Sequence, residues 1–143
     1  MKIYNLKDII FEIEPSQIFE LLKQLTEAPL LNPEQLYRIV SELPFNHNIF
    51  IILNEQKKLV GMITIIIESK LIHGGKQVGH IEDLVVDSKY RGLGIGKRLI
   101  EFSKTYAEQK NCYKIILDCN DETRKFYEKN KFTHKNCGMA LYF

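Results

Sequence analysis

Apolar residues in the first third of the chain recur with the period of an amphipathic helix. They fall on one face of residues 16–26, which predicts a helix there. A second helix is predicted from Asn32, because this residue can cap a helix that Pro33 opens, and Gln35 completes a capping-box-like pattern. The apolar positions of this helix end just before Pro44. Two helices are therefore expected before the first strand.

The pattern then changes to runs of β-branched residues, which are typical of strands. Residues 48–54 and 59–69 are two such runs, separated by the polar turn 55–58, and residues 79–86 are a third. The elements expected after them are a helix from residue 95, a strand over 113–118, a helix over 122–130 and a final β segment over 132–143.

This order of elements predicts an α/β fold. Strands that follow one another directly favour antiparallel pairing, whereas the later helical crossovers favour parallel pairing. A length of 143 residues fits one compact domain, residues 1–143, which can bury enough surface to fold without a metal or a disulfide. We therefore predict a single domain with a mixed, mostly antiparallel sheet flanked by helices.

Composition limits the classes of partner. The net charge of +2 is too small for binding a nucleic-acid backbone. Basic residues do gather over 89–104, which suits a small phosphorylated ligand or, alternatively, a solvated helix face. No apolar run is long enough to span a membrane, no secretory signal is recognised, and the three cysteines lack the spacing of a disulfide framework or a zinc site. We expect a cytoplasmic protein with no metal and no nucleic-acid partner.

The most informative segment is residues 80–98, HIEDLVVDSKYRGLGIGKR. A strand with two acids leads through a polar turn to glycines that open a helix, where free backbone N–H groups can bind phosphate. A dinucleotide fingerprint is excluded because its third glycine is replaced by lysine or leucine, and a P-loop because Arg98 replaces its Ser or Thr. The pattern that remains is Arg91-x-x-Gly94-x-Gly96, for which a glycine-rich turn without a ligand is the alternative interpretation.

This pattern resembles the pyrophosphate-binding signature Gln/Arg-x-x-Gly-x-Gly/Ala of the GNAT acetyltransferases. Further blocks, in order over residues 20–132, resemble the aminosugar branch of that family. The resemblance implies a GNAT-like fold, a homodimer and acetyl transfer from acetyl-CoA to the amine of D-glucosamine 6-phosphate, a step toward UDP-N-acetylglucosamine. The blocks are Leu25-Thr26-Glu27, Asn32-Pro33-Glu34-Gln35, Ile66-Ile67-Glu68, Ile72-His73, Gly79-His80-Ile81-Glu82-Asp83, residues 111–119 and Phe126-Tyr127-Glu128-Lys129.

The resemblance also implies where acetyl-CoA binds. The backbone of the glycine motif would hold the pyrophosphate, and the strand before it would hold the pantetheine arm. Thr123 stands where the family usually has an asparagine near that arm, and Lys131 replaces a glycine that is usual before Phe132. The implied cofactor-binding residues are Leu84, Val85, Val86, Arg91, Gly92, Leu93, Gly94, Ile95, Gly96, Lys97, Thr123 and Tyr127.

Four residues are implied in catalysis: Glu82, Asp83, Asp118 and Tyr127. Adjacent strand residues point to opposite faces, so we expect only one of Glu82 and Asp83 to position the sugar. Asp118 would contact the amine, and Tyr127 would donate a proton to the departing thiolate; which acid is the base stays open. Without the resemblance, the acids are interpreted as strand-end ion pairs and Tyr127 as a core tyrosine. The implied substrate-binding residues are Thr26, Lys70, His73, Glu82, Asp83, Lys114 and Asp118.

Two other functions remain open. A protein or peptide acetyltransferase would need an open groove in place of a phosphate pocket. A non-catalytic acyl-CoA-binding module would keep the glycine motif without the chemistry, and the threonine at 123 keeps that alternative open. Cys119 follows Asp118, but no histidine is placed to activate it. We therefore expect direct attack by the amine in a ternary complex.

Overall fold

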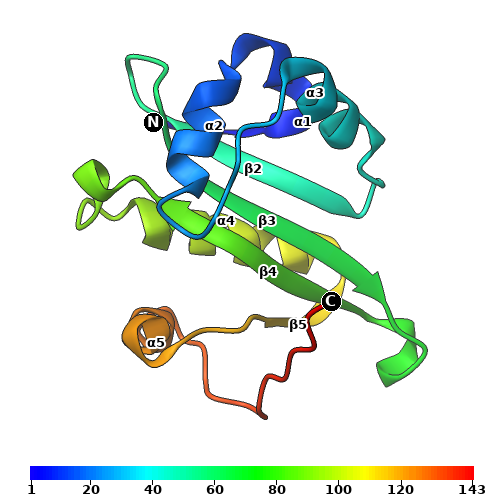
Figure 1. Ribbon diagram of the computed structural model, residues 1–143. Coiled ribbons are helices and arrows are strands. Elements are labelled where there is room, and N and C mark those ends of the chain that lie inside the picture. The colour runs from blue at the N-terminus through cyan, green and yellow to red at the C-terminus, as the bar shows by residue number, and fades with distance from the viewer.

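The computed structural model describes all residues, 1–143, and is built around one five-stranded sheet (Figure 1). The strands lie side by side in chain order, and every neighbouring pair is antiparallel except the last, which is parallel. The predicted mixed, mostly antiparallel sheet is therefore confirmed. The strands are β1 (Lys2–Asn5), β2 (His47–Leu53), β3 (Leu59–Ser69), β4 (Gln77–Val86) and β5 (Cys112–Ile116).

Helices pack on both faces of this sheet. The longest, α4, lies behind the sheet in Figure 1, and α1, α2 and α3 lie on the opposite face over β2 and β3. Helix α5 follows β5 at the edge of the sheet. The helices are α1 (Leu6–Ile9), α2 (Pro15–Leu22), α3 (Pro33–Glu42), α4 (Ile95–Gln109) and α5 (Asp121–Lys129), with short 3-10 turns η1 (Ile10–Glu12), η2 (His73–Gly75) and η3 (Ser88–Tyr90).

Two apolar layers, one on each face, hold the sheet and helices together. Ile51 belongs to the layer beneath α1–α3 and its neighbour Ile52 to the layer beneath α4, as the alternation of a strand requires. Both side chains are fully buried, and so are Leu99 and Ile100 of α4. Burying each such side chain contributes roughly 1.5–3 kcal/mol, so both layers are needed for a stable fold.

The start of α3 confirms the predicted capping box. Gln35 N donates to Asn32 Oδ1 (2.9 Å), and Asn32 N donates to the Gln35 side chain (3.1 Å). The helix predicted over 16–26 is shorter than expected, because α2 ends at Leu22. Beyond that point Gln24 is engaged by a distant turn, its Oε1 accepting from Ser88 N (2.8 Å). The last turn of the predicted helix is therefore a loop.

The two ends of the chain differ from the sequence prediction. Residues 2–5 form β1, which no helical or strand pattern indicated because the strand is only four residues long. The β segment predicted over 132–143 is wrong, since no strand is present there. The C-terminal segment finds no strand partner within the chain, and Met139 and Tyr142 are 98% and 92% exposed.

Candidate functional site

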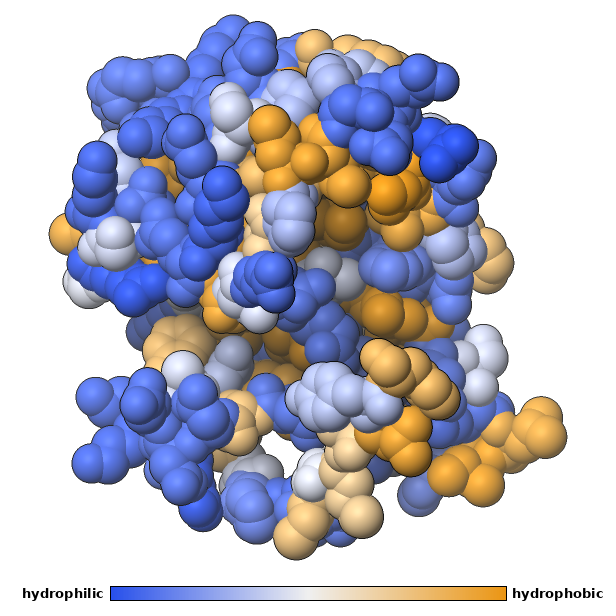
Figure 2. Space-filling view, in the orientation of Figure 1, coloured by the Kyte–Doolittle hydropathy of each residue, from blue (hydrophilic) through white to orange (hydrophobic).

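On the face of the sheet opposite α4, no helix lies over β5 or over the part of β4 before Val85, a region we call the open face (Figure 1). Ile81 and Ile115 pack beneath α4, so the residues that alternate with them point to the open face. Figure 2 shows this surface hollowed between the body of the molecule and the segments of α5 and the C-terminus. Charged residues from three strands face it, namely Glu68, His80, Glu82, Lys114 and, just beyond β5, Asp118.

The turn between β4 and α4 exposes the amino end of α4. Gly92 and Gly94 have φ values of 79° in the left-handed region, and a Cβ on either would meet no atom within 4 Å. The first intrahelical bond runs from Arg98 N to Gly94 O (2.9 Å), so the N–H groups of residues 95–97 have no helical acceptor. No side chain caps this end, and its first turn contains no acid. This helix end can therefore bind an anion.

The other residues of the glycine motif fix this turn or extend from it. Arg91 Nε donates to Val86 O (3.1 Å), which ties the turn to the end of β4. Ile95, the first residue of α4, is buried against the sheet, whereas Leu93 and Lys97 are exposed. The motif thus combines one core anchor with an open backbone and a solvent-facing lysine.

A bulge interrupts β4 beside this helix end. Two residues of β4, Asp83 and Leu84, stand opposite the single residue Ile63 of β3. Asp83 has a φ of 49°, a conformation that is uncommon for a residue with a Cβ. The pairing of β4 with β5 ends at His80, so the outer edge of β4 over residues 81–86 has no strand neighbour. That edge offers backbone groups to a ligand.

The bulge also interrupts the alternation of β4 beside the two acids. Ile81 and Leu84, three residues apart, both pack toward α4, whereas strict alternation would send them to opposite faces. The prediction that Glu82 and Asp83 point to opposite faces assumed this alternation, which does not hold at Asp83. The charge of Asp83 acts on Glu82.

Three carboxylates meet beside the bulge. The pKa of Glu82 is raised, first by burial and then by the negative charges of Asp83 and Asp118, and His80 partly opposes this rise. A carboxylate with a raised pKa accepts a proton more readily near neutral pH. Glu82, Asp83 and Asp118 therefore form a group that can receive and hold an amine.

Tyr127 is positioned by the packing of α5 against α4. The ring of Phe126 lies so close to Gly96 that a Cβ there would be 3.1 Å from Phe126 Cζ. Tyr127 packs against the rings of Phe126 and Phe132, with centroid separations of 5.0 Å and 5.9 Å. Burial raises the pKa of Tyr127, and the charge of Cys119 adds to the rise. The phenol, whose oxygen is not sealed from solvent, therefore stays protonated and can donate to a ligand.

The exposed start of α4 is the arrangement that the glycine motif predicted, and comparison with known proteins decides the family. The profile of the Acetyltransferase (GNAT) family matches residues 16–132. This chain belongs to the GNAT acetyltransferase family. The predicted GNAT-like fold is confirmed as well.

Comparison with individual proteins shows which members of the family this chain is similar to. The chain is 40% identical over 126 residues to glucosamine 6-phosphate N-acetyltransferase 1 of Dictyostelium discoideum, covering 86% of this chain and 80% of the relative. A crystal structure of glucosamine-6-phosphate N-acetyltransferase from Arabidopsis thaliana superposes with a TM-score of 0.86 at 35% identity, covering 99% of this chain and 97% of the other. The structure of a Trypanosoma brucei acetyltransferase gives a TM-score of 0.88 at 34% identity, covering 99% of both chains.

Thr123, at the position where the resemblance leads us to expect an asparagine, makes hydrogen bonds at the start of α5. Its backbone N donates to Asn120 Oδ1 (2.9 Å), and its hydroxyl donates to the same oxygen (2.9 Å). A side chain held by this cap is less free to contact a pantetheine arm. Cys119, just before the cap, is an exposed free thiol.

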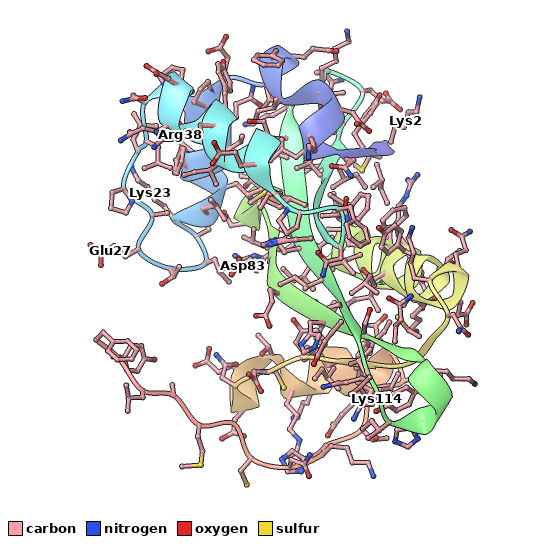
Figure 3. The ribbon with its side chains drawn as sticks, turned by 90° about the vertical axis from the view of Figure 1, so that its right-hand side faces the viewer. Lys2, Lys23, Glu27, Arg38, Asp83 and Lys114 are labelled. Atoms are coloured by element: carbon pink, nitrogen blue, oxygen red, sulfur yellow. The ribbon has the colours of Figure 1, made fainter.

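The substrate-binding residues predicted from the resemblance lie in two places. Lys114 Nζ lies 5.5 Å from the centre of the Tyr113 ring, and His73 stacks on the same ring at 4.3 Å. Thr26 lies instead on the loop between α2 and α3, where its N donates to Leu22 O (3.1 Å). Figure 3 shows this loop, with Glu27 labelled, on the same side of the sheet as Asp83, while Lys114 lies toward the other end of β4. The cations and the loop thus approach the open face from opposite ends.

The third predicted cation is Lys70, and it belongs to a cluster that sequence reasoning missed. Lys70 Nζ lies 2.5 Å from Glu68 Oε1, and His80 Nε2 lies 2.6 Å from Glu68 Oε2. No role was expected for Glu68 or His80 from the sequence, because the two residues are twelve positions apart. The signal that unites them is the antiparallel register of β3 and β4, which pairs Ile66 with His80.

Two further observations concern metals and membranes. No group of three or more His, Cys, Asp or Glu side chains is arranged to hold a metal ion. None of the helices combines the length and the apolar character needed to cross a membrane.

Proposed function

We propose that this chain transfers the acetyl group of acetyl-CoA to the amine of D-glucosamine 6-phosphate and forms N-acetyl-D-glucosamine 6-phosphate. Five relatives that are 34–40% identical over most of the chain bear the name of this activity. The observation that carries the proposal is the position of three carboxylates beside an uncapped helix end and an unpaired strand edge. Acetyl-CoA supplies an activated acetyl group at this place.

The start of α4 and the free edge of β4 supply the groups that hold acetyl-CoA. The N–H groups of residues 95–97, with the turn at Arg91–Gly94, bind the pyrophosphate through hydrogen bonds and the helix dipole. The free edge of β4 at residues 84–86 bonds the pantetheine arm as a neighbouring strand would. A backbone N–H of this edge polarises the thioester carbonyl. Both ends of the cofactor are thus held by backbone groups.

The residues that act on the amine lie next to this edge. Asp83 and Asp118 orient the amine, and Glu82 accepts its proton, directly or through water, because its pKa is raised. The amine nitrogen forms a bond to the carbonyl carbon while the carbon–sulfur bond breaks. Tyr127 gives its proton to the leaving thiolate. Alignment of the two reactants in one ternary complex supplies roughly 7–11 kcal/mol of the barrier reduction.

The sugar phosphate is bound by the cations at the far end of the open face. Lys70, His73 and Lys114 form the cationic set, and Thr26 contributes from the loop between α2 and α3. A phosphate is a strong acceptor for such groups. A peptide substrate has no phosphate for these cations to bind, which favours the aminosugar over the peptide alternative.

We further propose that the chain functions as a homodimer of single acetyltransferase domains, each spanning residues 1–143. Leu141, Tyr142 and Phe143 end the chain with apolar side chains that are at least 75% exposed. Exposed apolar clusters of this kind mark interaction surfaces, and a second copy is the partner that the family resemblance implies. The three free cysteines support a reducing compartment, the cytoplasm, where the product serves UDP-N-acetylglucosamine synthesis.

An acceptor panel tests the proposed function. The protein is incubated with acetyl-CoA and, separately, glucosamine 6-phosphate, glucosamine, a lysine-containing peptide or no acceptor, and the products are identified by mass spectrometry. We expect one acetyl group on the nitrogen of glucosamine 6-phosphate and much less product without the phosphate. Acetylation of the peptide alone would establish the protein acetyltransferase instead. Binding of acetyl-CoA without any acetylated product would establish the non-catalytic module.

A further inference from the structure

Glu68 joins two cationic side chains on the open face. One carboxylate oxygen, Oε1, lies 2.5 Å from Lys70 Nζ, and the other, Oε2, lies 2.6 Å from His80 Nε2. Both hydrogen bonds lower the pKa of Glu68, with the bond from Lys70 the larger cause. Glu68 is thus ionised, and each of its oxygens holds one partner in a fixed place.

The cluster continues along the strand toward the carboxylates. His80 and Glu82 are two residues apart on β4 and point to the same face. The imidazole is near enough to lower the pKa of Glu82, against the burial and the two aspartates that raise it. Lys70, Glu68, His80 and Glu82 therefore form a connected row of polar side chains across β3 and β4, with Glu68 at the junction.

We propose that Glu68 is a positioning residue for acetyl transfer, which acts on Glu82 through His80 and on the phosphate end of the substrate through Lys70. This inference rests on the proposed function. The Glu68 carboxylate accepts the Nε2–H of His80, so it fixes the orientation of the imidazole. Its other oxygen restrains the ammonium of Lys70, which otherwise ends a flexible side chain.

Few other titratable groups act on the pKa of Glu82. The titratable groups that act on Glu82 are His80 and Asp83 from β4 and Asp118 from the end of β5. The β3 residue paired with Glu82 is Thr64, which does not titrate. His80 is paired with Ile66 on one side and Ile116 on the other, so Glu68 is its charged hydrogen-bond partner. The position of the imidazole thus depends on Glu68.

The test compares Glu68→Gln with the unchanged protein in initial-rate measurements of acetyl transfer to glucosamine 6-phosphate across pH. Without the carboxylate the imidazole is no longer held in place beside Glu82. With the imidazole displaced, the pKa of Glu82 rises further, so we expect the acid limb of the kcat/KM profile to move to higher pH by about half a unit. This shift is smaller than the one to three pKa units that a close charge typically causes, because the groups are partly exposed to solvent. We also expect KM for the sugar phosphate to rise several-fold, because Lys70 is no longer restrained.

Single replacements of the two partners separate the two effects. His80→Gln should move the acid limb without raising KM, and Lys70→Gln should raise KM without moving the limb. The double variant Glu68→Gln, His80→Gln should show no larger pH shift than either single variant. Glu68→Asp keeps a carboxylate and should show a smaller pH shift than Glu68→Gln. Glu101→Gln is the matched control, since Glu101 pairs with Lys104 (2.8 Å) on α4 away from the open face, and it should change neither quantity.

Two results would overturn the proposal. One is an active Glu68→Gln variant whose acid limb and KM both match those of the unchanged protein. The other is a pH shift in Glu68→Gln that adds fully to that of His80→Gln, because the two residues would then act independently. Failure of the proposed function is a different outcome, since the unchanged protein would itself form no acetylated aminosugar.

Discussion

The two faces of β3 and β4 differ sharply in what they carry, although the same strands build both. Toward α4 these strands send Ile65, Ile67 and Ile81, all of which are at least 96% buried. Toward the open face they send Glu68, His80 and Glu82 from positions one residue away. The alternation of a strand thus lets one short segment provide stability on one side and charge on the other.

The bulge at Asp83 lies between the residues of β4 that pack toward α4 and those that carry charge on the open face. It shifts the alternation by one residue, so Leu84 packs toward α4 while Glu82 and Asp83 lie beside each other. If the open face is the catalytic face, substitutions there should change activity and leave stability nearly unchanged. Matched substitutions on the closed side should do the reverse.

The largest contrast is expected between two tyrosines that both pack against the layer beneath α4, of which Tyr106 alone has a hydrogen-bonded hydroxyl. Tyr127→Phe should lower kcat by about 10²- to 10⁴-fold, the usual contribution of general acid catalysis, and leave the aminosugar KM nearly unchanged. Tyr106→Phe is the control, because Tyr106 is on α4 and its hydroxyl accepts from Asn48 Nδ2 (3.1 Å) in the closed layer. It should cost about 1 kcal/mol of stability and leave kcat unchanged. A kcat of Tyr127→Phe within twofold, with chemistry limiting turnover, would mean that the phenol only packs.

A second contrast is between two glycines in the same left-handed conformation. Gly94 opens α4 and Gly74 lies in the turn between β3 and β4, with φ values of 79° and 68° and free space around both Cβ positions. Valine at either position carries the same kind of backbone strain, roughly 1–2 kcal/mol. Only Gly94→Val should obstruct the anion-binding helix end, and we expect it to weaken acetyl-CoA binding at least about tenfold, or roughly 1.4 kcal/mol, in calorimetric titration. Equal affinities in the two folded variants would remove the glycine motif from the cofactor site.

The acid pH limb gives a smaller effect. The pKa of Glu82 is raised, so the carboxylate that accepts the amine proton becomes protonated, and activity falls, at a pH above the usual range for glutamate. The folded protein holds this proton more tightly than the unfolded chain, so the charged group destabilises the fold above its folded pKa and ceases to do so as pH falls. Replacing Glu82 by Gln should remove the limb from the pH profile of residual activity and slightly raise stability near neutral pH. A limb that persists in this variant would assign the base to another acid.

The smallest expected effect concerns the end of α5, which carries Tyr127. Lys131 N donates to Glu128 O (3.0 Å) and Phe132 N to Tyr127 O (3.1 Å), the bonds of a Schellman motif, and Lys131 has a φ of 72°. Glycine suits that conformation better, so Lys131→Gly should stabilise the fold by roughly 1 kcal/mol in urea denaturation. Lys129→Gly, inside the helix, should destabilise it by a similar amount. A gain from both variants would contradict this account of the helix end.

Local patterns in the sequence predicted most of the fold. The capping box at Asn32, the strand over residues 59–69 and the helix that begins at residue 95 depend on neighbouring residues, and the structure confirms all three. The order of these elements also predicted the mixed sheet. The C-terminal β segment was wrong because a strand requires a partner, and its sequence does not show whether one is present.

The details of the site depend on distant pairing and were harder to predict. The bulge at Asp83 arises from the register between β3 and β4, and the free edge beyond His80 arises where β5 diverges. The link from Glu68 to His80 likewise depends on which residues face each other across the hairpin. The sequence could therefore name Glu82, Asp83 and Asp118 as candidates but could not show their arrangement.

The most direct test of direct transfer on the open face is a two-substrate initial-rate study that follows release of the CoA thiol. Acetyl-CoA and glucosamine 6-phosphate are varied together, and the protein is then examined by mass spectrometry after incubation with acetyl-CoA alone. We expect intersecting double-reciprocal lines, no thiol release without the aminosugar and no acetylated residue, with Cys119→Ala retaining most of the activity. Parallel lines together with an acetylated Cys119 would contradict direct transfer and establish a covalent intermediate.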